Sequence, residues 1–178
     1  AGRELCALIN SHPSLTLAFA TANEQRGSTS RLGGREVTYI ATEDASLESA
    51  EVVFSALPHG ASKHWVDVAR QRGARVVDLS SDLRPGHGCE GIPYGLTELV
   101  RDRLRSAEVV ANPGCYPTSI LLALSPAIAA GVIAPGSAIQ VSAASGVSGA
   151  GNAPKRELLF AEVSQDFRAY GVGNTHRH

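Results

Sequence analysis

Hydrophobic positions recur along this chain with two periods, and segments of the two kinds alternate. Leu5, Leu8 and Ile9 fall on one face of a helix, which the following His12 and Pro13 would end. The helical period predicts three helices, over residues 2–11, 61–72 and 119–130.

Apolar runs of strand length lie between the helices, over residues 15–20, 37–41, 51–57, 74–79, 107–111 and 138–144. The run over residues 51–57 is nearly all apolar, which is typical of a strand covered on both faces. Strands that alternate with helices predict an α/β fold with a doubly wound, Rossmann-type parallel sheet. Ligand-contacting loops in such sheets follow the carboxyl ends of the strands.

Composition narrows the possible functions. The 178 residues, with 43% hydrophobic content, suffice for one or two domains with a sizeable core. A formal net charge of −1 and no long basic run predict no binding to nucleic acid or to an anionic membrane surface. No apolar stretch reaches the roughly 18 residues of a spanning helix, and no signal peptide opens the chain, so we expect a cytoplasmic protein. Three widely spaced cysteines fit neither a disulfide framework nor a metal site.

One cysteine occupies a distinctive turn. The segment Asn112-Pro113-Gly114-Cys115-Tyr116-Pro117-Thr118 sets Cys115 at the start of an apolar helical run. Backbone N–H groups at a helix N-terminus favour a thiolate over a thiol. The turn therefore predicts a nucleophile, whereas the alternative is a small, inert residue packed under a turn.

Two places near the N-terminus are candidates for binding a nicotinamide cofactor. Gly2 stands where the last glycine of a glycine-rich turn would stand, although a flexible terminus is the simpler interpretation. Enzymes that bind NAD place a carboxylate at the end of the second strand, where this chain has Thr21-Ala22-Asn23, with Arg26 just beyond. Hydroxyl, amide and guanidinium groups suit a 2′-phosphate, so the sequence favours NADP over NAD.

A third cofactor candidate follows the apolar strand over residues 51–57. The segment Leu57-Pro58-His59-Gly60 lies where doubly wound sheets place ligand-contacting loops, but it also has the composition of an ordinary strand-to-helix turn.

Candidate substrate residues lie in the last third of the chain. Ser145, Gly146, Ser148 and Gly149 belong to a serine- and glycine-rich loop that could present donors to a phosphate or carboxylate, or could be a flexible linker. His176 and His178 could supply a general acid or base beside a reactive cysteine, or could belong to a solvated tail or a tag.

Four of these segments, 56–62, 112–118, 145–151 and 176–178, together resemble the N-acetyl-γ-glutamyl-phosphate reductase family of arginine biosynthesis. The resemblance implies reduction of an acyl phosphate to an aldehyde with NADPH, through a cysteine thioester. It makes Cys115 the nucleophile and His176 the acid/base, with His178 as second choice and substrate contact. It also implies a homo-oligomer, either dimer or tetramer.

The resemblance also sets domain boundaries and exposes departures from the family. We expect a dinucleotide-binding domain over residues 1–114, without its first strand and glycine turn, and the start of an α/β or α+β catalytic domain over residues 115–178. Residues 25–34 and 83–92 are shorter or more irregular than in the family, so we expect interrupted geometry there.

Two other functions stay open at this point, and a third is disfavoured by the local sequence of the cysteine. A related reductase of lysine biosynthesis acts on a carrier-bound aminoadipyl phosphate. Aspartate-semialdehyde and glyceraldehyde-phosphate dehydrogenases also use a cysteine thioester, but in a different local sequence. A nucleotide-binding regulatory module with an inert cysteine is the alternative outside enzymology.

Overall fold

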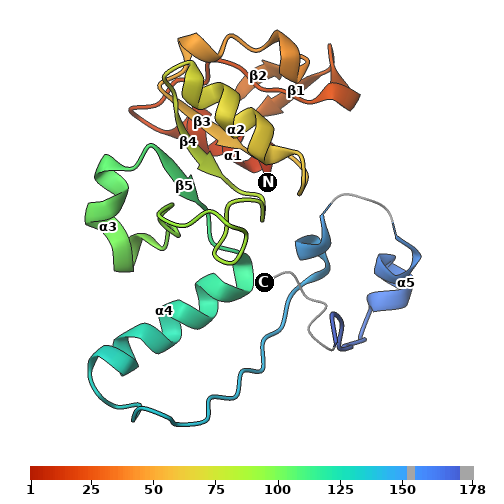
Figure 1. The fold of residues 1–178 in the computed structure, drawn as a ribbon. Coiled ribbons are helices and arrows are strands. Elements are labelled where there is room, and N and C mark those ends of the chain that lie inside the picture. Colours follow the sequence, from red (N-terminus) through yellow and green to blue (C-terminus); the bar gives the residue numbers. More distant parts are fainter. Residues whose placement is uncertain (152–154, 173–178) are drawn as a thin grey trace. The chain divides into compact units, whose positions relative to one another are not determined.

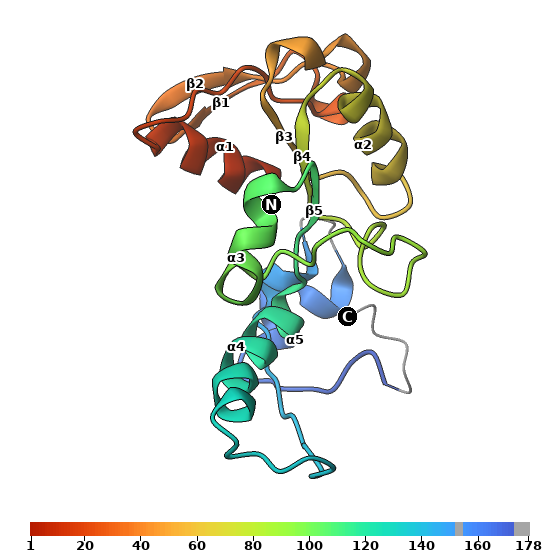
Figure 2. The same cartoon turned by 60° about the vertical axis from the view of Figure 1, so that its left-hand side comes forward.

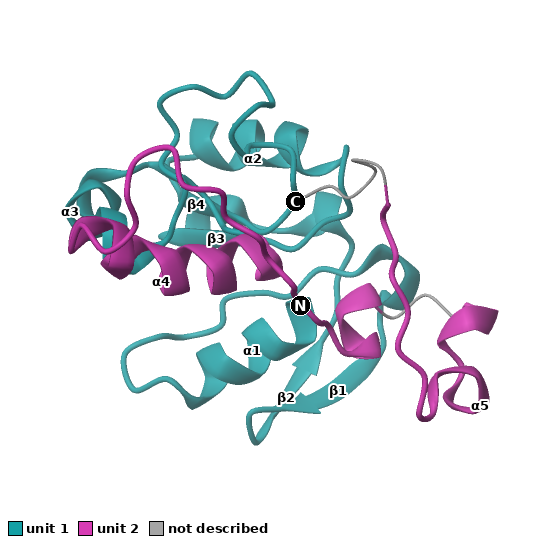
Figure 3. Cartoon of the chain, turned by 90° about the horizontal axis from the view of Figure 1, so that it is seen from below, with its two compact units in different colours: residues 1–113 teal, residues 114–178 magenta. Residues whose placement is uncertain are grey.

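The computed structural model describes residues 1–151 and 155–172. The chain divides into two compact units, residues 1–113 and residues 114–178 (Figure 3). Each unit is described by itself below.

A three-stranded parallel sheet organises the first unit (Figure 1). Its order is β3-β4-β5, and the central strand pairs Val76 with Val53 on one side and Val109 on the other. The elements that build it are β3 (Val52–Ser55), α2 (Ser62–Gln71), β4 (Arg75–Asp78), α3 (Thr97–Ser106) and β5 (Val109–Ala111). Each strand lies within the segment that the apolar pattern predicts, and α2 lies within its predicted helical segment.

Two helices lie on opposite sides of the sheet (Figure 2). Helix α1 (Gly2–Ser11) lies on one side and α2 on the other. Val66 and Ala69 of α2 pack with Val76 and Ala111 of the sheet in the main buried cluster. Their spacing of three residues puts both on one face of α2, so the helical period found in the sequence is the period that makes this core.

Residues 25–38 contain a hairpin that the sequence analysis did not predict as such. Strands β1 (Thr29–Leu32) and β2 (Arg35–Thr38) pair antiparallel around Gly33 and Gly34, which both have positive φ. A Cβ at Gly33 would collide with the carbonyl oxygen of Ala7 in α1, so glycine lets the hairpin approach that helix. The expectation of interrupted geometry over residues 25–34 is therefore wrong. Residues 83–92 do lack helix and strand, and consist of turns and bends.

Three strand predictions need correction. Residues 15–20 form no strand, because a strand needs a bonded neighbour along its length. Pairing begins only at their end, where the Ile40 N–H donates to the Ala20 carbonyl at 3.0 Å and an isolated bridge joins Thr21 to Ile40. Residues 138–144 also lack a ladder partner among the described residues, so they form no strand. Val52 and Phe54 of β3 are 42% and 36% exposed, so β3 is not covered on both faces.

The second unit is dominated by one apolar helix, α4 (Cys115–Ala129), which includes the predicted segment except its last residue and starts four residues earlier. None of its residues is buried. A short helix, α5 (Phe160–Val163), and two 3-10 turns, Val147–Ala150 and Arg156–Leu158, complete the described part of this unit. Within the described ranges, no helix combines the length and the apolar character that crossing a membrane requires.

Candidate active site

Three loops meet at the edge of the sheet where the parallel strands end. Main-chain bonds extend the ladder past the strands, from Leu79 N–H to the Ser55 carbonyl at 2.9 Å and from Asn112 N–H to the Asp78 carbonyl at 2.7 Å. Ligands of doubly wound sheets bind outside this edge. The structure thus places the predicted Leu57–Gly60 loop beside the loop after β4 and the beginning of the cysteine turn.

A buried carboxylate fixes the start of α2 to the sheet. Asp78 accepts a hydrogen bond from the Ser62 hydroxyl at 2.5 Å and another from the Ser80 hydroxyl at 2.7 Å. Because the Ser62 proton goes to Asp78, the Ser55 hydroxyl donates to Ser62, at 2.6 Å. All four side chains are buried, so the network satisfies polar groups that water does not reach.

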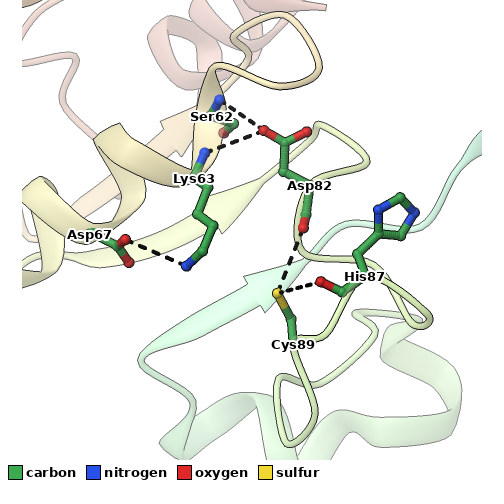
Figure 4. A network of polar contacts seen from close by, with 6 residues as sticks. All are labelled: Ser62, Lys63, Asp67, Asp82, His87 and Cys89. Atoms are coloured by element: carbon green, nitrogen blue, oxygen red, sulfur yellow. Dashed lines mark hydrogen bonds and ion pairs between the residues drawn. The ribbon is translucent and has the colours of Figure 1, made fainter.

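A second carboxylate, Asp82, binds backbone N–H groups at the same helix start. It accepts backbone N–H bonds from Gly60 at 2.8 Å, Ser62 at 3.0 Å and Lys63 at 3.3 Å. Figure 4 shows the Ser62 and Lys63 bonds. Burial acts to raise the pKa of Asp82, but these bonds and one to the Ser80 side chain outweigh it, so the pKa lies below its usual value.

The ring of His59 is held by the loop after β4. Its Nδ1 accepts the Ser81 N–H at 2.8 Å and lies 3.0 Å from the Ser81 hydroxyl. Accepting from a backbone N–H requires an unprotonated Nδ1, which leaves the proton of a neutral ring on Nε2. The predicted cofactor loop is thus fixed by residues far away in sequence.

Arg84 is a candidate site residue that the sequence analysis missed. It is only 8% exposed, and its Nε and Nη2 donate to the carbonyls of Asn112 and Leu79, each at 3.2 Å. Its Nη1 is buried without a hydrogen-bond partner among the described residues. A guanidinium with one unused donor suits an anion. The signal for it was a charged residue in a loop that follows a strand.

The predicted cofactor-binding residues near the N-terminus lie in two separate places. A Cβ on Gly2 would lie 3.7 Å from the Cβ of Ala56, so Gly2 and the Leu57–Gly60 loop are neighbours. Ala22 donates its N–H to the Ile40 carbonyl at 3.0 Å, and the Asn23 side-chain oxygen accepts the Thr42 N–H at 2.8 Å. Beside them Arg26 pairs with Asp44, at 3.0 Å between Nη2 and Oδ2.

In the second unit, Cys115 is the first residue of α4 and is exposed, so its predicted position at a helix start is confirmed. Gly114 is the N-cap residue, and its carbonyl accepts both the N–H and the hydroxyl of Thr118, at 3.0 and 2.8 Å. The first turn is therefore well ordered around the thiol. Its role as nucleophile stays a prediction.

Two tyrosines lie close to Cys115. The Tyr170 hydroxyl donates to the Tyr116 hydroxyl at 2.7 Å, and the centroids of the two rings are 6.4 Å apart. This hydrogen bond, burial and the charges of Tyr116 and Cys115 raise the pKa of Tyr170, against an opposing interaction with Ser145. The structure thus brings predicted residues Cys115 and Ser145 into one neighbourhood, through a tyrosine that the sequence analysis did not single out.

The serine- and glycine-rich loop is tightly folded. Residues Val147–Ala150 form one 3-10 turn, and Gly149 donates its N–H to the Gly146 carbonyl at 3.0 Å. A Cβ at Gly149 would lie 2.6 Å from the Ser145 hydroxyl, so a larger residue there would displace the Ser145 side chain. Ser148 lies in the turn. His176 and His178 lie outside the described residues. Over the described ranges, no three histidine, cysteine or acidic side chains gather as a metal site would require.

Two family models match the chain. The NAD binding domain of semialdehyde dehydrogenases matches residues 1–107, and the dimerisation domain of semialdehyde dehydrogenases matches residues 115–178. The N-acetyl-gamma-glutamyl-phosphate reductase of Salinispora arenicola is 42% identical over 100% of this chain and 58% of that protein. The protein of the same name from Citrifermentans bemidjiense is 38% identical, over 99% of this chain and 57% of the relative. The chain spans little more than half the length of these relatives.

Solved structures agree on the fold. The crystal structure of aspartate semialdehyde dehydrogenase II from Vibrio cholerae, complexed with ASA, matches with a TM-score of 0.62. The two sequences are 23% identical, and the match covers 72% of this chain and 42% of that one. This likeness and the parallel sheet confirm the predicted α/β fold class.

Proposed function

The chain belongs to the semialdehyde dehydrogenase family, and we propose that it takes part in the NADPH-dependent reduction of N-acetyl-γ-glutamyl phosphate to the γ-semialdehyde, in arginine biosynthesis. The observation that carries the proposal is the exposed thiol of Cys115 on the first residue of α4. A cysteine thiol exposed on the first residue of a helix is accessible to an electrophile and can act as a nucleophile. An acyl phosphate is a strongly activated carbonyl and suits such a nucleophile.

The covalent step follows from the residue types. The Cys115 sulfur forms a bond to the acyl carbon, the bond from that carbon to the phosphate oxygen breaks, and inorganic phosphate leaves with its electron pair. The product is a thioester on Cys115. When bound, the nicotinamide supplies a hydride. We assign to His176, with His178 as second choice, the proton that neutralises the oxygen of the hemithioacetal formed by hydride addition. Return of that proton to the histidine lets the carbon–sulfur bond break, which releases the aldehyde and the Cys115 thiolate.

Arg84 supports an acyl phosphate as the substrate. It is anchored to the carbonyl of Asn112, three residues before the nucleophile, and its Nη1 donor is unused. A buried guanidinium with such a donor can donate a hydrogen bond to a phosphate oxygen. We assign further substrate contacts to Ser145, Gly146, Ser148 and Gly149.

The proposed cofactor site combines Gly2, the first residue of α1, with residues of two loops. Gly2 would allow close approach of the backbone, and Leu57-Pro58-His59-Gly60 would contact the cofactor at the strand ends. We propose NADP over NAD because Thr21, Ala22 and Asn23 include no carboxylate and Arg26 follows them. We further propose that the enzyme is a cytoplasmic homo-oligomer whose dinucleotide-binding domain ends at residue 114 and whose catalytic domain starts at Cys115.

The decisive experiment is an assay in the reverse direction on the complete protein, with N-acetylglutamate γ-semialdehyde, inorganic phosphate and either NADP or NAD. The proposal expects phosphate-dependent cofactor reduction that is faster with NADP. No reduction, together with slow alkylation of Cys115 near neutral pH, would favour a regulatory module with an inert cysteine. Activity restricted to a carrier-bound aminoadipyl semialdehyde would favour the reductase of lysine biosynthesis.

A further inference from the structure

The N-terminus of α2 is already occupied by a side chain of the protein. Both oxygens of Asp82 are used, Oδ1 by the N–H of Gly60 and Oδ2 by the N–H groups of Ser62 and Lys63. The N–H groups of Ser62 and Lys63 are donors that a helix start offers to an anion, and the Gly60 N–H belongs to the preceding loop. In a doubly wound sheet such a helix start, directly after a strand, is a natural place for a cofactor phosphate.

Asp82 is itself held from several sides. Its own N–H donates to the Ser80 hydroxyl at 3.0 Å, and that hydroxyl donates to the buried Asp78. The Cys89 thiol lies 3.7 Å from the Asp82 carbonyl, as Figure 4 shows. The adjacent Ser81 binds the ring of His59. The loop after β4 is thus bound to the loop after β3 through the Asp82 carboxylate and through His59.

We propose that Asp82 is a positioning residue for cofactor binding. Its carboxylate takes the place of an anion at the start of α2, closes this helix end to cofactor phosphates, and fixes the backbone of residues 57–60 in the shape that receives the nicotinamide cofactor. The inference rests on the proposed function, because it assigns the Leu57–Gly60 loop to the cofactor. Asp82 acts through this loop, by the hydrogen bonds that it accepts from its backbone.

The positioning role of Asp82 requires a carboxylate, and we expect the neutral isostere asparagine to replace it poorly. Three N–H donors converge on two oxygens. An asparagine offers one oxygen, and its amide group would point donor to donor at the remaining N–H. Asp82→Asn should therefore loosen the Gly60 side or the Ser62 side of the loop, and Asp82→Ala should release both.

The test measures NADPH binding directly, by fluorescence titration of the complete protein in buffer without phosphate. Asp82→Ala should weaken NADPH binding by about tenfold or more, which corresponds to loss of charge-assisted hydrogen bonds worth about 1.4 kcal/mol. Formate supplied to this variant should restore much of the affinity, because it can enter the vacated anion site, and should leave the wild type unchanged. In steady state, the KM for NADPH should rise while kcat at saturating NADPH stays within about threefold.

Asp67→Asn is the matched control. Asp67 is an exposed carboxylate of the same helix, and it pairs with the side-chain ammonium of Lys63, 3.5 Å away, rather than with a backbone N–H group of the helix start (Figure 4). Its replacement should leave NADPH binding unchanged. Asp82→Asn and Asp82→Ser keep an acceptor for the helix start and extend the test if Asp82→Ala does not fold.

The outcomes separate this inference from the proposed function. A wild type that binds NADPH but reduces no acyl phosphate would refute the proposed reaction. The NADPH titration of the Asp82 variants would still test the role of Asp82. An active wild type whose folded Asp82 variants bind NADPH with unchanged affinity, with only a lower Tm, would show a purely structural cap and overturn the inference. Formate that fails to restore binding in a folded Asp82→Ala variant would also overturn it.

Discussion

Arg26 and Asp44 form an ion pair at the place where the sequence locates the 2′-phosphate of the cofactor, with 3.0 Å between Nη2 and Oδ2. Both side chains are more than half exposed, so the pair contributes little to stability. If the proposed 2′-phosphate site is correct, Asp44 would compete with the incoming phosphate for the Arg26 guanidinium.

Asp44→Asn should therefore tighten NADPH binding by about three- to tenfold and leave NADH binding unchanged, since only NADPH carries the 2′-phosphate. Parallel fluorescence titrations with both cofactors measure the effect. Glu48→Gln removes another exposed carboxylate, paired with Arg72, and should change neither affinity. Equal effects of Asp44→Asn on both cofactors would place the phosphate elsewhere.

Ala22→Asp tests the same location by adding a negative charge instead of removing one, so the expected change in NADPH affinity is opposite. A carboxylate at the end of this segment should repel the 2′-phosphate, weaken NADPH binding and narrow its advantage over NADH. Ala22→Asn introduces a side chain of the same shape without the charge and should have a smaller effect. If the aspartate variant binds NADPH as tightly as the wild type, the phosphate does not approach residue 22.

Cys115→Ser should abolish nearly all acyl-phosphate reduction while NADPH binding persists, because an unactivated hydroxyl is a poor nucleophile at neutral pH. Loss of a nucleophile normally costs several orders of magnitude in kcat, so more than about a tenth of the activity remaining would refute the assignment.

Cys6 and Cys89 serve as internal controls for this substitution. Burial raises the pKa of the Cys6 thiol, which keeps it protonated and slow to react with an alkylating reagent. Serine at either position should leave turnover largely unchanged, whereas Cys115 should be alkylated first. A large loss of turnover with Cys89→Ser would redirect attention to the loop after β4.

The sheet was predictable because its strands are apolar runs of strand length. The hairpin was not predicted because Thr29–Leu32 and Arg35–Thr38 are mostly polar, and the available signal was the pair Gly33-Gly34 between them. Residues 15–20 have the pattern of a strand, yet a strand also requires a partner, which no local pattern supplies.

Site residues were likewise predictable only where the signal is local in sequence. Cys115 was predictable because its turn and the following apolar helix are continuous in sequence. Asp82 and Arg84 were not, because Asp82 binds a helix start about 20 residues away and Arg84 binds a carbonyl 28 residues away. Their roles arise only where parallel strands bring loops together. The roles of His176 and His178 remain predictions.

Arg84→Met should raise the KM for the phosphorylated substrate by tenfold or more, and likewise the KM for inorganic phosphate in the reverse reaction. A tenfold change corresponds to about 1.4 kcal/mol of binding free energy. The substitution should also destabilise the fold by about 1–3 kcal/mol, because the carbonyls of Asn112 and Leu79 lose their donors. Kinetics and urea unfolding measure the two effects.

Arg84→Lys separates charge from geometry. A lysine keeps the positive charge but cannot donate in the planar pattern that serves both carbonyls, so it should recover part of the phosphate KM and less of the stability. Unchanged KM values for phosphate in a folded Arg84→Met protein would exclude Arg84 from the substrate site.

Asp82 makes the stability of the protein sensitive to acid. Its pKa is lowered in the folded state, so its contribution is fully present above the unfolded pKa of about 4 and is lost as pH falls through the lower folded value. Asp82→Asn removes this titration. The difference in free energy of unfolding between wild type and variant should be constant from about pH 6 to pH 7 and should shrink below about pH 4. Urea unfolding across this range measures it, with Asp67→Asn as the control, and a difference that stays constant down to about pH 2.5 would contradict the lowered pKa.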